Sequence, residues 1–230
     1  MRKKEALVTA LGFFVTVILT ALVIALLWSV TGKREESGVT ALTEKGRMIV
    51  IDAGHGGSDG GAVAPDGTLE KELNLEISRI LCALMRVSGY DVVMTRENDV
   101  MLGETKMKDL KARLQTFTDS DGALSVSLHC NKFPDPSCNG LQVYYADTPS
   151  SRAAAEAVQA AFSLVSDVNR RQVKKADSSI YLLHRASSPA ILVECGFLSN
   201  PEELERLKTD EYRKKLALAV MSGVSTFYGE

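Results

Sequence analysis

The feature that most constrains this chain is a short apolar segment that leads into a glycine-rich loop containing a histidine. Residues 48–51 read MIVI, a run rich in β-branched residues and bounded by turn signals, which predicts a buried strand. The loop after it contains several glycines, which allow the backbone to fold tightly around His55. Glu70 follows at the start of a predicted helix. This segment therefore places an imidazole and a carboxylate on either side of a tight loop.

Two familiar glycine-rich loops do not fit this segment. A phosphate-binding loop requires Gly-Lys-Ser/Thr after four intervening residues, and a dinucleotide-binding loop requires glycine at its first, third and sixth positions. Asp59 occupies the sixth position here. A histidine and a glutamate around such a loop are instead a common beginning of a zinc site.

Two later predicted strands end in residues of the same chemical types. The run ALSVSLHCN alternates apolar and polar residues, which predicts a half-buried strand ending at His129. Residues 190–193, AILV, predict a buried strand ending at Glu194. Ligands of open α/β sheets bind beyond the carboxyl ends of the strands. We therefore expect His55, His129 and Glu194 to share one edge of a sheet, with Glu70 near it.

The segments AGHGGSDGGA, EKELNL, SLHCN and VECGFLSNPEE occur in this order within roughly residues 48–227. They resemble the motifs of the zinc-dependent N-acetylmuramoyl-L-alanine amidases of the Amidase_3 type. The resemblance implies that His55, Glu70 and His129 bind one Zn²⁺ ion and that Glu194 is the catalytic carboxylate. Ala53 replaces the proline that usually precedes Gly-His in this family, which concerns the rigidity of the loop and not the ligand.

The resemblance also implies a fold and a reaction. We expect an α/β fold: a single three-layer domain over residues 47–230, with a mostly parallel twisted sheet flanked by helices. Zinc with three protein ligands keeps an open position for water, and Glu194 would act as general base and acid. The substrate would be the amide between N-acetylmuramic acid and L-alanine in peptidoglycan. The alternative from another class is a catalytically silent, membrane-tethered peptidoglycan-binding module.

Three further polar residues are candidates for substrate binding. Arg96 follows a predicted strand at residues 91–95, and Arg113 lies in a predicted helix around residues 108–117. Spacing alone favours solvated surface charges for both. The resemblance offers the alternative that Arg96, Arg113 and Asn131, which ends the SLHCN motif, contact the substrate.

The N-terminal part of the chain predicts a membrane anchor. Residues 6–30 are apolar and uncharged over a length that can cross a bilayer, and three basic residues precede them. We expect residues 1–5 to be cytoplasmic, residues 6–30 to be a transmembrane signal-anchor and residues 31–46 to be a linker. The catalytic domain would then be extracytoplasmic, in the cell wall or the intermembrane space of the forespore. A cleaved signal peptide is the competing interpretation.

The charge balance excludes one class of partner. The chain has 27 basic and 29 acidic side chains, and its small basic cluster near residues 170–175 fits a solvated loop. Nucleic-acid binding requires a broad positive field, so no nucleic acid is expected.

A single short domain behind one anchor resembles the sporulation amidases of the family. That likeness implies action in the spore cortex before germination, an activating lipoprotein and a downstream muramic acid deacetylase that forms the δ-lactam. A vegetative cell-separation role is the alternative.

The remaining residues of interest are cysteines and one histidine. Cys130 and Cys138 are close enough in sequence for a disulfide, although sequence does not establish the geometry. Cys82 and Cys195 are expected in the core. A cysteine nucleophile beside His129 is disfavoured, because neighbours in a strand point to opposite faces. His184 lies outside every motif and is expected to be structural.

The rest of the chain predicts alternating elements. We expect an amphipathic helix through residues 73–84, a strand at residues 141–145, a helix at residues 151–168, an extended piece at residues 179–183, and one or two helices over residues 201–228.

Overall fold

The computed structural model describes residues 47–166 and 171–230. The predicted cytoplasmic tail, signal-anchor and linker lie outside the described residues. Among the helices that are described, none combines the length and the apolar character needed to span a bilayer. Residues 47–230 form one compact unit.

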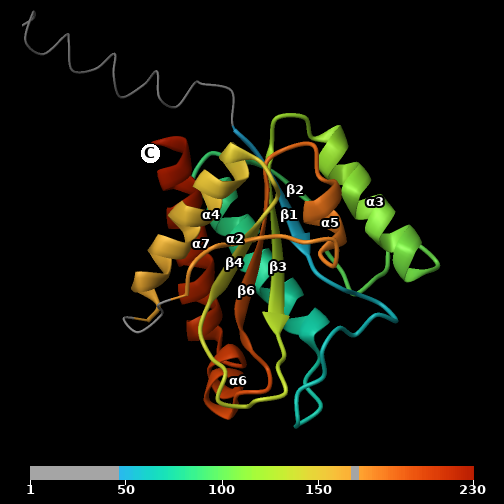
Figure 1. The fold of residues 1–230 in the computed structure, drawn as a ribbon, viewed down its shortest axis with the longest axis vertical. Helices are drawn as coiled ribbons and strands as arrows, with labels where there is room; N and C mark the ends of the chain where they lie inside the picture. Colours follow the sequence, from blue (N-terminus) through green and yellow to red (C-terminus); the bar gives the residue numbers. More distant parts are fainter. Residues whose placement is uncertain (1–46, 167–170) are drawn as a thin grey trace, which may run out of the picture. The chain divides into compact units, whose positions relative to one another are not determined.

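The centre of this unit is a six-stranded sheet in the order β2-β1-β3-β6-β4-β5 (Figure 1). The strands are β1 (Met48–Ala53), β2 (Asp91–Met94), β3 (Leu124–Asn131), β4 (Gln142–Tyr145), β5 (Lys174–Lys175) and β6 (Ala190–Phe197). The first four strands in this order are mutually parallel, and β4 runs antiparallel to β6. The expected mostly parallel α/β sheet is confirmed.

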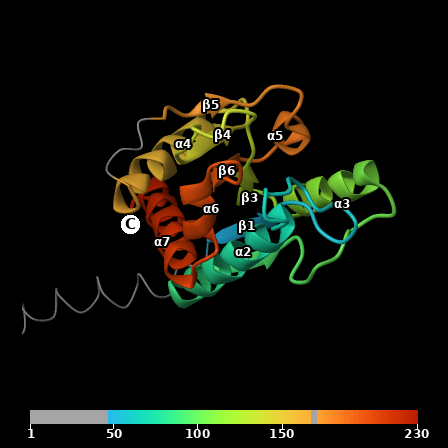
Figure 2. The ribbon, with the colours of Figure 1, turned by 90° about the horizontal axis from the view of Figure 1, so that it is seen from below.

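Helices cover both faces of the sheet, which gives three layers (Figure 2). The helical segments are α2 (Glu70–Val87), α3 (Lys106–Asp119), α4 (Pro149–Ala161), the 3₁₀ turn η2 (Phe162–Leu164), α5 (Tyr181–Arg185), α6 (Pro201–Leu207) and α7 (Asp210–Tyr228). The larger core cluster joins one sheet face to α2, α4 and α7. The smaller cluster joins the other face to α3 and α5.

Alternation along the strands assigns the side chains to these two faces. In β3, Val126 and Leu128 belong to the larger core, whereas Ser125 and Ser127 point to the opposite face. Both serines are completely buried. The prediction of a half-buried strand is therefore wrong, because β3 lies in the middle of the sheet and helices cover its polar face as well.

Three other predictions need correction. Residues 179–183 are not extended, because α5 begins at Tyr181. The strands predicted to end at Glu194 and at His129 continue to Phe197 and to Asn131, so both residues lie within their strands and not at the ends. The short edge strand β5 was not predicted at all. The helix predicted at residues 151–168 ends as α4 at Ala161 and continues as η2 to Leu164, and residues 167 and 168 lie outside the described residues.

Candidate active site

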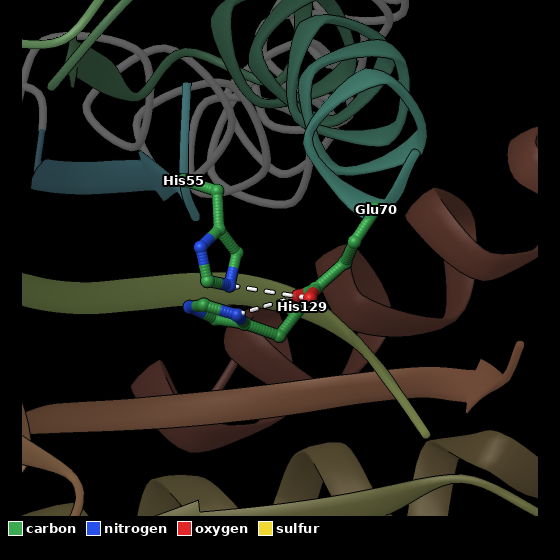
Figure 3. Close-up of side chains that lie close together, drawn as sticks. All are labelled: His55, Glu70 and His129. Carbon is green, nitrogen blue, oxygen red and sulfur yellow. Dashed lines mark hydrogen bonds and ion pairs between the residues drawn. The ribbon is translucent and has the colours of Figure 1, made fainter. Parts of the chain in front are cut away.

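Three predicted ligands meet at the carboxyl edge of the parallel strands (Figure 3). His55 lies just after β1, Glu70 is the first residue of α2, and His129 lies near the end of β3. Their nearest nitrogen and oxygen atoms all lie within 4.8 Å of one another. Glu70 Oε1 is 2.8 Å from His129 Nδ1, and Glu70 Oε2 is 3.2 Å from His55 Nε2. The structure thus brings these residues together as expected.

The loop between β1 and α2 has an unusual backbone at the histidine. His55 has a φ of 62°, and in the described part of the chain it is the one non-glycine residue with positive φ. A left-handed conformation is uncommon for a residue with a side chain. A Cβ added at Gly61 would lie 2.6 Å from Glu70 Oε2 and 2.7 Å from His55 Cδ2, and Gly61 itself has a φ of +69°. The loop can therefore wrap around the ligands only with glycine at this position.

Asp59 lies beside the first histidine, a contact that the sequence interpretation missed. Its Oδ2 atom lies 2.9 Å from His55 Nδ1, and its Oδ1 atom accepts a hydrogen bond from the backbone N–H of Gly61. An acidic partner at one ring nitrogen fixes the tautomer and leaves the other nitrogen free for a metal. The signal was Asp59 itself, the one acidic residue of the GHGGSDGGA segment, which had been used only to exclude a dinucleotide loop.

The charges of the three ligands are strongly coupled. Burial alone would raise the pKa of Glu70, but hydrogen bonds and charge interactions with His129 and His55 lower it well below its ordinary value. Burial alone would lower the pKa of His129, yet the Glu70 carboxylate raises it above its ordinary value. Glu70 is therefore ionised at neutral pH and supplies a negative oxygen between two imidazoles.

Glu194 lies beside this group on the next strand. The parallel register pairs His129 with Glu194, so both side chains project from the same face of the sheet. Glu194 Oε2 is shielded from solvent and has no hydrogen-bond partner within the described residues. Burial raises the pKa of Glu194 to about 7. This carboxylate is thus held next to the ligands and free to exchange a proton.

The donor set fits a zinc ion. Zn²⁺ in catalytic sites is bound by two or three imidazole nitrogens with carboxylate oxygens, and keeps one position open. Here two imidazoles and one carboxylate present such atoms, and they come from three separate elements. The side chains of His55 and His129 are 17% and 19% exposed, so the group remains accessible from one side.

The accessible side opens into a small apolar cavity. Its volume is about 230 Å³, and its walls include both histidines, Lys106 at the start of α3, and Ile180 and Leu182 around the start of α5. A molecule that reaches the histidines through this cavity meets mainly apolar side chains and one cationic amine.

Arg96 and Arg113 lie beneath the loop and not on the surface. They are 3% and 1% exposed, so the interpretation as solvated charges is wrong. Their guanidinium groups donate to the carbonyl oxygens of residues 53–55. Binding of substrate by Arg96 and Arg113 stays a prediction, and these contacts support a different role. Asn131 ends β3, where its carbonyl accepts from Leu198, and its contact with substrate also stays a prediction.

A buried acid in β1 anchors Arg113, and the sequence interpretation missed it too. Asp52 is completely buried and accepts hydrogen bonds from Thr95, Ser127 and Arg113 at 2.6 to 2.8 Å. Burial alone would raise the pKa of Asp52, but the Arg113 charge and the two hydroxyl groups lower it. An acid inside an apolar strand was the available signal, since a buried carboxylate requires partners.

The cysteines do not take part in this site. All four are free thiols in the structure, with Cys138 partly exposed and the other three buried. Burial raises the pKa of Cys130 and Cys195 far above the ordinary value, which opposes a nucleophilic role. Both side chains belong to the larger core on the face opposite His129, as predicted from strand alternation. His184 is exposed on α5.

Comparison with known proteins agrees with this geometry. Residues 49–226 match the family model of N-acetylmuramoyl-L-alanine amidase, Amidase_3. The germination-specific N-acetylmuramoyl-L-alanine amidase of Bacillus subtilis is 32% identical over 199 residues, which cover 83% of each chain. The CwlD amidase of Clostridioides difficile, solved in complex with the GerS lipoprotein, superposes with a TM-score of 0.76 at 35% identity, over 80% of this chain and 98% of that one. The amidase AmiC2 of Nostoc punctiforme gives a TM-score of 0.72 at 33% identity, with coverage of 80% and 98%. This chain therefore belongs to the Amidase_3 family of N-acetylmuramoyl-L-alanine amidases, which are hydrolases of peptidoglycan.

Proposed function

We propose that the enzyme is zinc-dependent, and that His55, Glu70 and His129 hold the ion. The observation that carries this proposal is the convergence of three ligand atoms within 4.8 Å from a loop, a helix start and a strand. When bound, zinc supplies a Lewis acid that activates water and polarises the scissile carbonyl. The protein supplies a fixed donor set with one accessible side.

Glu194 is the proton-transfer group in this proposal. Its Oε2 atom has no competing hydrogen bond in the described part of the protein, and it lies next to His129 in the register of the sheet. It takes a proton from the attacking water and later donates it to the amine of L-alanine that leaves. A metal cation between the histidines would favour the ionised form that accepts this proton.

The apolar cavity is the side from which substrate approaches. It borders both histidines, and residues of α3 and of the start of α5 form its other walls. An amide carbonyl placed between the ligands and Glu194 would leave adjacent parts of the substrate against this cavity. The small methyl side chain of L-alanine suits its apolar walls.

The cellular role that we propose is maturation of the spore cortex. Support comes from the relative named as germination-specific in Bacillus subtilis and from the C. difficile CwlD amidase. The enzyme would remove stem peptides from peptidoglycan so that a muramic acid deacetylase can act and the δ-lactam can form. An activating lipoprotein is part of the proposal, because that C. difficile amidase was solved with one. The predicted anchor at residues 6–30 would hold the domain outside the cytoplasm.

Two measurements test the catalytic proposal. His55→Ala should lose both zinc and activity. Glu194→Gln should keep zinc and lose release of peptide from peptidoglycan by about 10²- to 10⁴-fold. A Glu194→Gln protein with wild-type turnover would contradict the assigned role. Zinc-loaded wild-type protein that releases no peptide, even with a lipoprotein partner, would favour a silent binding module.

A separate measurement tests the cellular role. Deletion of the gene should abolish muramic δ-lactam in spores, as measured by mass spectrometry of digested cortex. Persistence of the lactam would favour the vegetative alternative and would leave the zinc chemistry unaffected.

A further inference from the structure

We propose that Arg96 and Arg113 are positioning residues that fix the backbone of His55 in the orientation required for metal binding. The proposal rests on the zinc site described above. It concerns how this ligand is held, and it assigns the two arginines to neither substrate nor metal. Its basis is a set of hydrogen bonds to three consecutive carbonyl groups.

Arg113 binds the carbonyl on the far side of His55. Its Nη2 donates to His55 O at 2.6 Å, and its Nη1 donates to Ala53 O at 2.7 Å and to Asp52 Oδ1 at 2.8 Å. Asp109, one turn earlier in α3, accepts from Nε at 2.6 Å. The two acids fix the plane of the guanidinium, so its remaining N–H groups have a defined direction.

Arg96 binds the carbonyl on the near side of His55. Its Nη2 donates to Gly54 O at 2.9 Å and to Lys71 O at 2.8 Å, and its Nε donates to Ala53 O at 2.8 Å. Among the described residues no acidic side chain lies within ion-pair distance of this guanidinium. A buried cation without an acidic partner is costly, so its contacts with backbone carbonyls account for its presence.

The two contacts together determine the conformation of His55. The Gly54 carbonyl lies in the peptide plane before His55, and the His55 carbonyl lies in the plane after it. Fixing both planes fixes φ and ψ of the residue between them. The φ of 62° at His55 is unfavourable for a residue with a side chain, so surrounding contacts must maintain it. The arginines supply such contacts on both sides of His55, and Asn74 Nδ2 adds a longer one to Gly54 O at 3.2 Å.

The direction of the side chain follows from the backbone. With φ and ψ fixed, the Cα–Cβ bond points the imidazole toward Glu70, where Nε2 lies 3.2 Å from Oε2. Asp59 approaches only the ring itself, with its Oδ2 atom 2.9 Å from Nδ1. Lysine in place of either arginine keeps the charge but cannot present several N–H groups in one plane.

The experiment compares three full-length variants with the wild-type protein. Arg96→Lys and Arg113→Lys alter the contacts, and Arg213→Lys is the matched control. Arg213 is also mostly buried and donates to a backbone carbonyl, that of Leu207, but its partners lie on α2, α6 and α7. Zinc affinity is measured by competition with a chromogenic chelator. Thermal unfolding of the metal-free proteins is measured in parallel.

We expect both loop variants to bind zinc about 10- to 100-fold more weakly than wild type. The control should lose thermal stability and keep wild-type zinc affinity. Wild-type affinity in both loop variants would overturn the inference and leave the arginines a purely structural role. If Arg113→Lys does not fold, Arg96→Lys decides the question alone, because its replacement leaves no acid unpaired. Failure of the wild-type protein itself to bind zinc would instead refute the proposed function.

Discussion

A single added methyl group at Gly54 tests whether the rate of peptide release depends on the position of the His129 side chain. A Cβ at this position would lie 2.3 Å from His129 Cε1 and 2.4 Å from Nε2. Carbon atoms in contact are separated by about 3.5 Å, so the imidazole must move by roughly 1 Å. The ring cannot rotate away without loss of the 2.8 Å contact between Nδ1 and Glu70. Gly54 does not have positive φ, so alanine introduces no backbone strain that would confuse the result.

A displacement of about 1 Å at a reacting group can reduce the rate by about 10²-fold. We therefore expect Gly54→Ala to lose about 10²-fold in the rate of peptide release from peptidoglycan, and to bind zinc more weakly. Gly60→Ala is the matched control from the same loop. Its added Cβ would lie 3.5 Å from Leu69 Cδ2, an ordinary contact, so rate and zinc affinity should remain near wild type.

The assay combines mass spectrometry of released peptides with measurement of bound zinc. Circular dichroism of each variant establishes that the fold is intact. If Gly54→Ala releases peptide at the wild-type rate, then either His129 can shift without loss of activity or the reaction rate does not depend on its position. Both outcomes would refute the reasoning from the structure.

Three further predictions follow from the same contacts. Asp59→Asn should weaken zinc binding by about 10- to 100-fold with little change in thermal stability, because it removes the carboxylate beside His55 Nδ1. Unchanged zinc affinity in a chelator competition would count against a role of Asp59 in metal binding. Treatment with a metal chelator should abolish peptide release and added Zn²⁺ should restore it, and activity that survives complete removal of metal would exclude zinc dependence. Folding lowers the pKa of Asp52 below its value of 3.8 in the unfolded chain. Its ionised carboxylate therefore contributes fully to the free energy of unfolding above that pH, and this contribution is lost as the pH falls through the lower pKa of the folded state. Asp52→Asn should be less stable than wild type at pH 7 by about 3 to 5 kcal/mol. Below about pH 4, the free energy of unfolding should fall more steeply with pH in wild type than in this variant. Urea titrations in which both proteins lose stability equally as the pH falls would contradict this.

The sequence was sufficient for the parts of the fold that depend on local patterns. The apolar run of β1 and the helical spacing in α2 predicted both elements, and the histidine between them predicted the site. The position of β3 in the sheet was not a local property. Its alternating serines indicated one solvated face, but Ser127 is buried and donates to Asp52. Only the strand order shows that both faces of β3 are covered.

The arginines illustrate the same limit at the site. Isolated charges after a strand and within a helix are usually solvated, and nothing in the spacing of Arg96 and Arg113 indicates otherwise. Their burial depends on β2 and α3 lying next to the loop after β1, which brings together residues about 40 and 60 positions apart. Asp59 could have been recognised, since it stands in the same short loop as His55 and a metal-binding histidine usually has an acidic or carbonyl partner.

The position of Glu194, the proposed catalytic carboxylate, depends on the register of the strands in the core. On β6, Val193 and Cys195 face the larger core, while Glu194 between them projects from the opposite face of the sheet, as His129 does on β3. The parallel pairing of β3 with β6 places Glu194 next to His129. A slip of one residue would exchange Glu194 with a neighbour and bury its charge among apolar side chains, at a cost of several kcal/mol. The apolar residues of β6 in the larger core thus favour the same register that the proposed chemistry requires. Core packing and active-site geometry are therefore set by one alignment of two strands.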